Sequence, residues 1–285
     1  MREQVQKPWN SILPVAGALS IIIAWQFLLP WAGVPSYIVP TPVEIGRIFA
    51  KESTLLWTNF WPTVYEAVMG FLLGNAVAVL LATIFVYNRY IQAAYFPVIL
   101  FLNTIPILAL APVIILIFGL GVMPKIIIAA VICFFPTLVN MIRGLESVSA
   151  NEVELFRVLS ASKLETLWKL RLPRALPFLF SSLRISSATA VIGAVVGEWI
   201  GSDKGLGAMI IQATFNYQSG RLYAAITLCS CLAIALFLIV VAVEKLVLRH
   251  DVETRTSIPA CRKLHLRHFH DWSARPWSTS VFKVR

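Results

Sequence analysis

Long apolar runs alternate with short polar stretches along most of the chain, a pattern typical of helices that cross a lipid bilayer. A helix needs about 20 mainly apolar residues to cross a hydrocarbon core of about 30 Å. Six segments fit this requirement, the fourth being the shortest, and they cover residues 11–29, 64–86, 91–118, 126–142, 183–200 and 222–248. The pattern therefore predicts an all-α, polytopic membrane protein with about six transmembrane helices.

The first apolar segment follows a basic start that contains Arg2 and Lys7. Such a start is compatible with a cleaved signal peptide or with a retained membrane anchor. The apolar run is long, and no clear small-residue cleavage site follows it. These features favour a retained anchor.

Composition supports the membrane assignment. Hydrophobic residues make up 58% of the 285 residues, charged residues make up 13%, and the mean hydropathy is +0.78. Soluble domains are nearer half apolar and a quarter charged, so this chain is neither a soluble domain, a disordered protein nor a coiled coil. Four cysteines are also too few for a secreted disulfide scaffold of this length.

The net charge of +10 could suggest nucleic-acid binding, but the distribution of basic residues has a topological explanation. With a cytoplasmic N-terminus, nineteen of the 24 basic residues lie inside, and those outside are Arg47, Lys51, Lys125, Lys204 and Arg221. Lys and Arg concentrate on the cytoplasmic side of membrane proteins. The sequence thus predicts that both termini are cytoplasmic and that nucleic acid is not a partner.

The inside loop 143–182 is nearly 40 residues long and too polar to cross the membrane. Its leucines alternate with charged residues at near-helical spacing, which predicts two short amphipathic helices. We expect a break near 160–162, and we expect Pro173 and Pro177 to end the second helix. The pattern suits helices that lie on lipid and equally suits a docking surface for a cytoplasmic partner.

From Glu154 this loop reads ELFRVLSASKLETLWKLRLPRALP. It resembles the EAA loop of bacterial ABC-importer permeases, in which Glu-Ala-Ala, three residues, Gly, nine residues, an aliphatic residue, any residue and Leu-Pro follow one another. The positions that match this spacing without a gap are Glu154, Ser160, Leu170, Leu172 and Pro173. Those that match the extended form of the sulfonate, taurine and nitrate branch are Arg157, Ala161 and Ser162.

The chain departs from the EAA pattern at three positions. Leu155 and Phe156 replace the two alanines, and Ser160 replaces the glycine. Serine fits a left-handed turn less comfortably than glycine does. Two further stretches, at 103–125 and 195–207, also resemble this branch, and the second, VVGEWIGSDKGLG, resembles permeases for thiamine-pyrimidine precursors and riboflavin more closely.

The resemblance, which covers about 38–249, implies a type I importer permease in the bacterial inner membrane. Such a chain works as a homodimer, with ABC ATPase subunits on the cytoplasmic side and an extracytoplasmic solute-binding protein outside. It carries a small solute, anionic or heteroaromatic, and is not an enzyme. It binds no cofactor, since ATP is hydrolysed by the partner; consistently, no G-x-x-x-x-G-K-[ST] motif is present.

The apolar pattern and the basic residues divide the chain into a cytoplasmic N-terminus (1–10), a transmembrane permease domain (11–249) and a cytoplasmic tail (250–285) that we expect to be disordered. Loop 143–182 becomes the element that couples to the ATPase. The residues expected to carry this coupling are Glu154, Arg157, Ser160, Ala161, Leu164, Trp168, Leu170, Leu172 and Pro173.

Small residues recur every four positions in the fifth segment, where Gly193 and Gly197 share one face. They suit close helix packing within the chain, or a lining of the pathway or dimer seam. Glu198 follows them, and a buried charge is costly in a membrane. It could pair with Lys204 or Lys125, or it could contact substrate or gate the mouth, whereas a solvated helix end suffices for Glu66.

The third segment contains Asn103 and Pro106 side by side. Proline removes a backbone donor and bends a helix. A bent polar spot in the membrane can line a pathway, although a kink that merely fits the bundle explains it equally well.

In the tail, His265, His268 and His270 lack the tight spacing of a metal site, and no metal is expected.

Two other classes of protein were weighed against the importer. A stand-alone secondary transporter or channel would show internal repeats and intramembrane titratable residues. A membrane-embedded enzyme would show a catalytic cluster. The sequence displays neither internal repeats nor a catalytic cluster, and Glu198 lies too near the membrane surface to indicate ion coupling.

Overall fold

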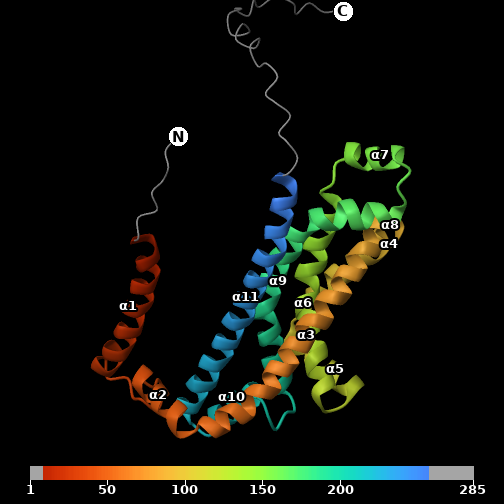
Figure 1. The fold of residues 1–285 in the computed structure, drawn as a ribbon. Coiled ribbons are helices and arrows are strands. Elements are labelled where there is room, and N and C mark those ends of the chain that lie inside the picture. The colour runs from red at the N-terminus through yellow and green to blue at the C-terminus, as the bar shows by residue number, and fades with distance from the viewer. Residues whose placement is uncertain (1–8, 257–285) are drawn as a thin grey trace, which may run out of the picture. The chain divides into compact units, whose positions relative to one another are not determined.

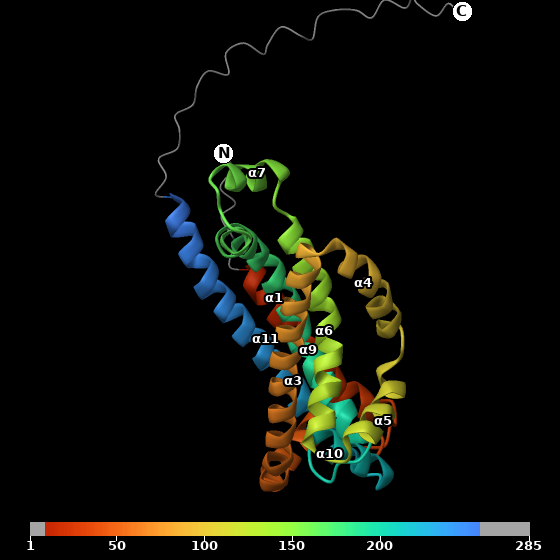
Figure 2. The same cartoon turned by 90° about the vertical axis from the view of Figure 1, so that its right-hand side faces the viewer.

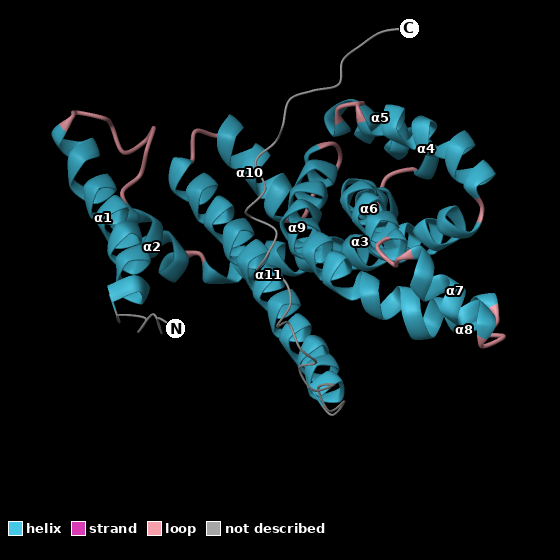
Figure 3. Ribbon diagram, turned by 90° about the horizontal axis from the view of Figure 1, so that it is seen from above, coloured by secondary structure: helices cyan, strands magenta, loops and turns pink. Residues whose placement is uncertain are grey.

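The computed structural model describes residues 9–256, and every regular element within that range is a helix (Figure 3). The helices are α1 (Trp9–Trp31), α2 (Pro42–Lys51), α3 (Ser53–Tyr87), α4 (Arg89–Asn103), α5 (Ile107–Phe118), α6 (Val122–Glu146), α7 (Ala150–Val158), α8 (Lys163–Thr166), the π-helical turn η1 (Leu167–Arg171), α9 (Leu172–Trp199), α10 (Leu206–Phe215) and α11 (Ser219–Thr256). The all-α prediction is confirmed.

Three long helices, α3, α6 and α9, form the centre of the fold, with α6 packed against both others (Figures 1 and 2). Glycines set the separation of these helices. A Cβ atom at Gly193 would lie 2.6 Å from the Cα of Ala129, and one at Gly197 would lie 3.0 Å from the Cα of Lys125. Gly193 and Gly197 therefore lie at the contact between α9 and α6, where only a missing side chain lets the backbones approach so closely.

Within the described residues, four helices are long and apolar enough to cross a membrane, and they cover Ser53–Tyr87, Val122–Glu146, Lys163–Trp199 and Ser219–Leu248. The number becomes five if α4 and α5 together make one bent span. The first predicted segment corresponds to α1, whose apolar stretch Ala16–Trp31 is shorter. The fold of a polytopic membrane protein is thus established, and the expected count of six spans stays a prediction.

The third predicted segment is not one kinked helix. It consists of α4 and α5, whose axes differ by 105° (Figure 2). Pro106 stands at the N-cap of α5 and Thr104 at the C-cap of α4. Proline lacks an N–H group, so Pro106 donates no bond to α4, and the hydrogen bonds of α5 begin with its carbonyl, which accepts from Ala109 and Leu110.

The predicted break near Ser160 separates α7 from α8, but of the two short helices predicted in loop 143–182 only α7 is a separate short helix. The prediction that Pro173 and Pro177 end the second helix is wrong, because α8, η1 and α9 follow one another without interruption. Leu172 N–H bonds to the carbonyl of Leu167, five residues back. This wider turn changes the hydrogen-bond register next to Pro173, where a donor is missing, so the helix can continue.

The chain divides into two units, residues 1–245 and 246–285. All contacts described below belong to the first unit. In the second unit the helix α11 continues to Thr256, so the first residues of the predicted tail are helical. The remainder of that tail, with His265, His268 and His270, lies outside the described residues.

Candidate functional site

We define the coupling segment as residues 149–173, the part of loop 143–182 that contains α7, α8 and η1. Two capping boxes begin its helices. The hydroxyl of Ser149 accepts from Glu152 N–H at 3.3 Å, and the hydroxyl of Ser162 accepts from Glu165 N–H at 3.2 Å. The two glutamates return the bond by accepting from the serine N–H groups at 3.0 and 2.9 Å. The S-x-x-E spacing is visible in the sequence and could have located both helix starts.

A left-handed turn separates the two helices. Ser160 has a φ angle of +56°. Its N–H bonds to the carbonyl of Arg157 at 2.9 Å, and the N–H of Ala161 bonds to the carbonyl of Phe156 at 2.9 Å. These bonds form a Schellman motif, whose left-handed position is usually glycine. Ser160 is the residue that falls on the glycine of the EAA pattern, so the turn geometry is kept despite the substitution.

The start of α8 and the turn η1 are anchored to the ends of α3 and α6. Tyr87, at the end of α3, donates a hydrogen bond from its hydroxyl to the carbonyl of Lys163 at 2.8 Å. Arg171 donates from Nη1 to the carbonyl of Leu145 at 3.0 Å, and its guanidinium lies 5.8 Å from the centre of the Tyr87 ring. A cation over an aromatic face is an attractive contact. A displacement of the segment must therefore displace these helix ends.

The helix α7 is tied to α9 by an ion pair between Glu152 and Arg174. Hydrogen bonds from the backbone N–H and the hydroxyl of Ser149, together with the Arg174 charge, hold the pKa of the Glu152 carboxyl below its usual range. Glu152 is thus ionised at neutral pH, where it caps α7 and holds it to α9.

Large apolar side chains are exposed on the coupling segment, among charged ones. Five large side chains on it are between 57% and 77% exposed, namely Leu155, Val158, Leu159, Leu164 and Trp168. Most of the other exposed residues of the segment are polar or charged, among them Glu154, Arg157 and Lys163.

The residues predicted to carry coupling fall into two groups. Those exposed on the surface are Glu154, Arg157, Ser160, Leu164 and Trp168. Those half-buried are Ala161, Leu170, Leu172 and Pro173, of which Leu172 packs against the core formed by α3, α6 and α9. The first group can touch a partner, and the second holds the segment on the bundle.

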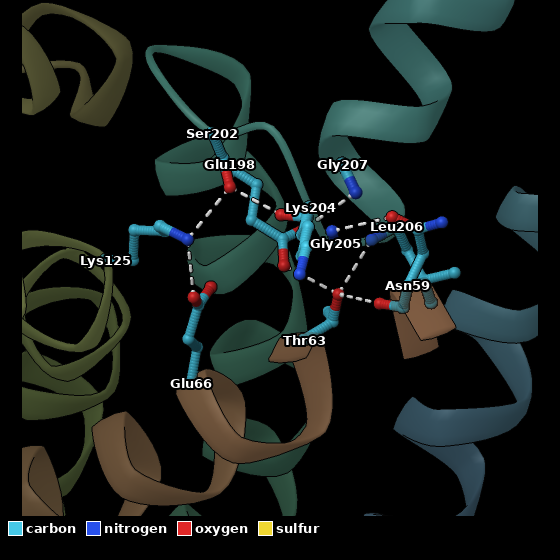
Figure 4. A network of polar contacts seen from close by, with 10 residues as sticks. All are labelled: Asn59, Thr63, Glu66, Lys125, Glu198, Ser202, Lys204, Gly205, Leu206 and Gly207. Carbon is cyan, nitrogen blue, oxygen red and sulfur yellow. Dashed lines mark hydrogen bonds and ion pairs between the residues drawn. The ribbon is translucent and has the colours of Figure 1, made fainter. Parts of the chain in front are cut away.

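A buried polar cluster lies at the other ends of these helices, next to α10 (Figure 4). Lys125 Nζ of α6 lies 2.6 Å from Glu66 Oε1 of α3 and 2.9 Å from the hydroxyl of Ser202. Glu66 is only 1% exposed. The expectation of a solvated position for Glu66 is therefore wrong, because α3 turns this carboxylate toward α6.

Glu198 of α9 belongs to the same cluster and is also 1% exposed. Its two carboxylate oxygens accept from the hydroxyl of Thr63 at 2.6 Å and from the N–H of Gly207 at 2.6 Å. The expected ion pair with Lys204 or Lys125 is not found within the described residues, since Lys125 pairs with Glu66. Glu198 instead holds the loop before α10 through a backbone amide.

The contact between this loop and α3 is completed by two further bonds. Leu206 N–H donates to the Thr63 hydroxyl at 2.8 Å, and Gly205 N–H donates to Asn59 Oδ1 at 3.0 Å. Gly205 has a φ angle of +119°, and a Cβ atom there would collide with the Glu198 carboxylate. Glycine is therefore required at position 205 by its backbone conformation and by the carboxylate beside it.

Asn103 and Pro106 lie at the bend between α4 and α5. Asn103 lines a cavity of about 480 Å³ bounded by α3, α4, α5 and α6, whereas Pro106 does not. The three regions that the sequence singled out are thus placed apart: the coupling segment at one end of the bundle, the polar cluster beside α10, and the bend along its side (Figure 2).

The chain matches the family described as binding-protein-dependent transport system inner membrane component over residues 74–250. It is 33% identical over 237 residues to a probable ABC transporter permease protein of Haemophilus influenzae, covering 83% of this chain and 94% of the relative.

Two further relatives carry names that state a solute. A riboflavin transport system permease protein of Chloroflexus aurantiacus is 33% identical, covering 85% of this chain and 91% of the relative. A putative aliphatic sulfonates transport permease protein of Bacillus subtilis is 34% identical, covering 72% and 75%. The inward-facing MetNI methionine ABC transporter aligns with a TM-score of 0.57 at 19% identity, covering 70% of this chain and 98% of that one, and shows the shared fold.

Proposed function

Since the chain belongs to the binding-protein-dependent transport system inner membrane components, and is thus a membrane-spanning permease subunit of an ABC importer for a small solute, we propose that its coupling segment 149–173 docks on the ATPase subunit. The observation that carries this proposal is the exposed apolar face on a segment with the EAA spacing. Leu164 and Trp168 are each 65% exposed on this face. Tryptophan is enriched among the residues that dominate the energy of protein interfaces, so Trp168 is the main anchor that we assign.

Charged residues surround this apolar face. Glu154 and Arg157 are exposed on α7, and Lys163 is exposed at the start of α8. An apolar centre with a charged rim is the usual anatomy of an interface, in which the rim sets partner choice and the centre supplies affinity. We assign Leu164 and Trp168 to the centre, and Glu154 and Arg157 to the rim.

The anchors of the segment supply the mechanical part of the proposal. Tyr87 and Arg171 connect it to the ends of α3 and α6, and it continues directly into α9. A force applied by the ATPase to the segment therefore reaches all three central helices. Two such segments pushed together by ATPase closure would tilt these helices and switch the pathway between inward-facing and outward-facing states.

The remaining parts of the assembly follow from the family. Importers of this family depend on an ATPase and on a binding protein. We propose that a second copy of this chain completes the pathway, that both termini lie in the cytoplasm, and that this chain itself binds no ATP. The basic residues concentrated on loop 143–182 and on the tail support this orientation.

Retention of the ATPase tests the docking proposal. The ATPase encoded with this chain is co-purified with wild type, Trp168→Ala and Glu154→Arg. Trp61→Ala is the matched control, since Trp61 is 63% exposed on α3, outside the coupling segment. We expect Trp168→Ala to reduce ATPase retention about tenfold or more, as the loss of an interface anchor does, and Trp61→Ala to leave it unchanged. Equal retention by both variants overturns the proposal.

A further inference from the structure

The bend between α4 and α5 leaves backbone polar groups without helical partners. Thr104 and Ile105 N–H bond only three residues back, to Phe101 and Leu102, and Pro106 has no N–H. At the start of α5, the N–H groups of residues 107 and 108 have no backbone acceptor among the described residues, and no side chain caps the helix. At membrane depth, such irregular backbone is tolerated only where it is buried in protein or lines a wet cavity.

A cavity of about 480 Å³ lies beside this bend. Its walls come from four helices: Leu73 from α3, Ile99 from α4, Leu110 from α5, and Val131 and Phe134 from α6. The volume is within the range of small-molecule sites, which are mainly apolar and carry a few polar groups that orient the ligand. Broken helices that meet at such a cavity recur in transporters, where they surround the solute.

Asn103 provides the only polar side chain in the lining of this cavity. Asn103 is exposed, and its amide makes no hydrogen bond with another described residue, so its donors and acceptor are open to a ligand. The cavity therefore presents one free donor–acceptor group against apolar walls. Phe134 and Phe135 add two aromatic rings to those walls.

The side chains that line the cavity favour one class of solute, a neutral ring, over another, an anion. The lining contains no charged side chain, and an anion that leaves water without a cationic partner loses its hydration without compensation. Lys125, in α6, is held by Glu66 in the polar cluster. Aromatic walls favour a flat ring that stacks against them, and the Asn103 amide can bond to a ring carbonyl and a ring nitrogen.

We propose that the cavity at the α4–α5 bend is the membrane-embedded solute site, and that it takes a neutral, flat ring system rather than an anion. This inference rests on the proposed function, because it gives the importer its solute class. The names of the relatives do not decide the question, since they include both riboflavin and aliphatic sulfonates. The choice of a neutral ring over an anion rests instead on the residues that line the cavity.

The test uses the complete complex of this chain with its ATPase in lipid nanodiscs, with riboflavin as the ring probe and pentanesulfonate as the anion probe. Val131→Trp fills the cavity. Val113→Trp is the matched control, because Val113 is 50% exposed on α5 and does not line the cavity, whereas Val131 is 41% exposed and lines it. Asn103→Leu removes the amide at nearly constant size and guards against a folding defect in Val131→Trp.

We expect wild type to bind riboflavin and not pentanesulfonate. Val131→Trp should weaken riboflavin binding about tenfold or more, and Asn103→Leu should weaken it about tenfold. Val113→Trp should leave riboflavin binding unchanged. Three results overturn the inference: no riboflavin binding to wild type up to about 1 mM, equal binding by Val131→Trp and Val113→Trp, or pentanesulfonate competing for the cavity. A changed subunit stoichiometry in Val131→Trp also overturns it, because the cavity would then be a subunit contact.

ATPase retention separates this inference from the proposed function. If the Trp168→Ala and Trp61→Ala variants retain the ATPase equally, the proposed function fails. If they differ as expected and the cavity variants have no effect, only the solute site is wrong.

Discussion

Lys125 Nζ of α6 lies 2.6 Å from Glu66 Oε1 of α3, and both side chains are almost fully buried. Removing one partner of a buried ion pair leaves an uncompensated charge, which costs about 3–5 kcal/mol. We expect Lys125→Met to lower the thermal unfolding temperature of the purified protein markedly. The double variant Lys125→Met, Glu66→Gln should recover most of the loss, because no charge is then left unpaired. A single variant as stable as wild type would show that the pair contributes nothing.

Glu198→Ala removes the carboxylate that accepts from Thr63 and from the Gly207 amide. Buried donors left without an acceptor cost about 1–3 kcal/mol each. We expect faster hydrogen exchange of the amides of residues 205–209, with little change in α7. Glu154→Ala, at an exposed position, is the control. Unchanged exchange before α10 in Glu198→Ala would rule out a latch at this carboxylate.

Ser160 holds a left-handed conformation in which a residue with a Cβ is strained by roughly 1–2 kcal/mol. Ser160→Gly relieves this strain but adds freedom to the unfolded chain, worth about 0.5–1 kcal/mol. We expect a net stabilisation of up to about 1 kcal/mol in chemical unfolding. Ser160→Val should instead destabilise the protein, because a β-branched side chain is poorly accommodated there. Stabilisation by valine would refute the turn geometry.

The depressed pKa of Glu152 makes the attachment of α7 sensitive to acid. A carboxyl group whose pKa is lowered on folding stabilises the folded state fully above its unfolded pKa, about 4.3. This contribution is lost as the pH falls through the lower folded pKa. Protection of α7 from hydrogen exchange should thus decrease below about pH 4. Glu152→Gln should show weak protection at pH 7 and no further loss in acid, whereas Glu154→Gln should behave as wild type.

The apolar pattern and the EAA spacing predict much of this molecule, since both depend on residues close together in the chain. The break at Ser160 is an example, because it follows from a local spacing that places a turn between two amphipathic stretches. The capping boxes at Ser149 and Ser162 are equally local, and could have been found from the S-x-x-E spacing.

The pairing of Glu66 with Lys125 could not be predicted in the same way. The two residues are 59 positions apart, and their contact depends on how α3 and α6 are rotated against each other. The continuation of the helix through Pro173 depends likewise on the wide turn at η1, which no residue pattern in the sequence predicts. The proline at 106 predicts a kink, but an angle of 105° depends on contacts of α5 with α6 that are distant from the bend in sequence.

Site-directed cross-linking between this chain and its ATPase tests the central claim most directly. In a chain whose native cysteines are replaced, Leu164→Cys places a thiol on the apolar face of the coupling segment. Leu120→Cys, at a position 77% exposed between α5 and α6, is the control. We expect a short bifunctional reagent to join Leu164→Cys to the ATPase in the assembled complex and to leave Leu120→Cys free. A complex that retains the ATPase but gives no cross-link at 164, or equal cross-links at both positions, would contradict docking through the coupling segment.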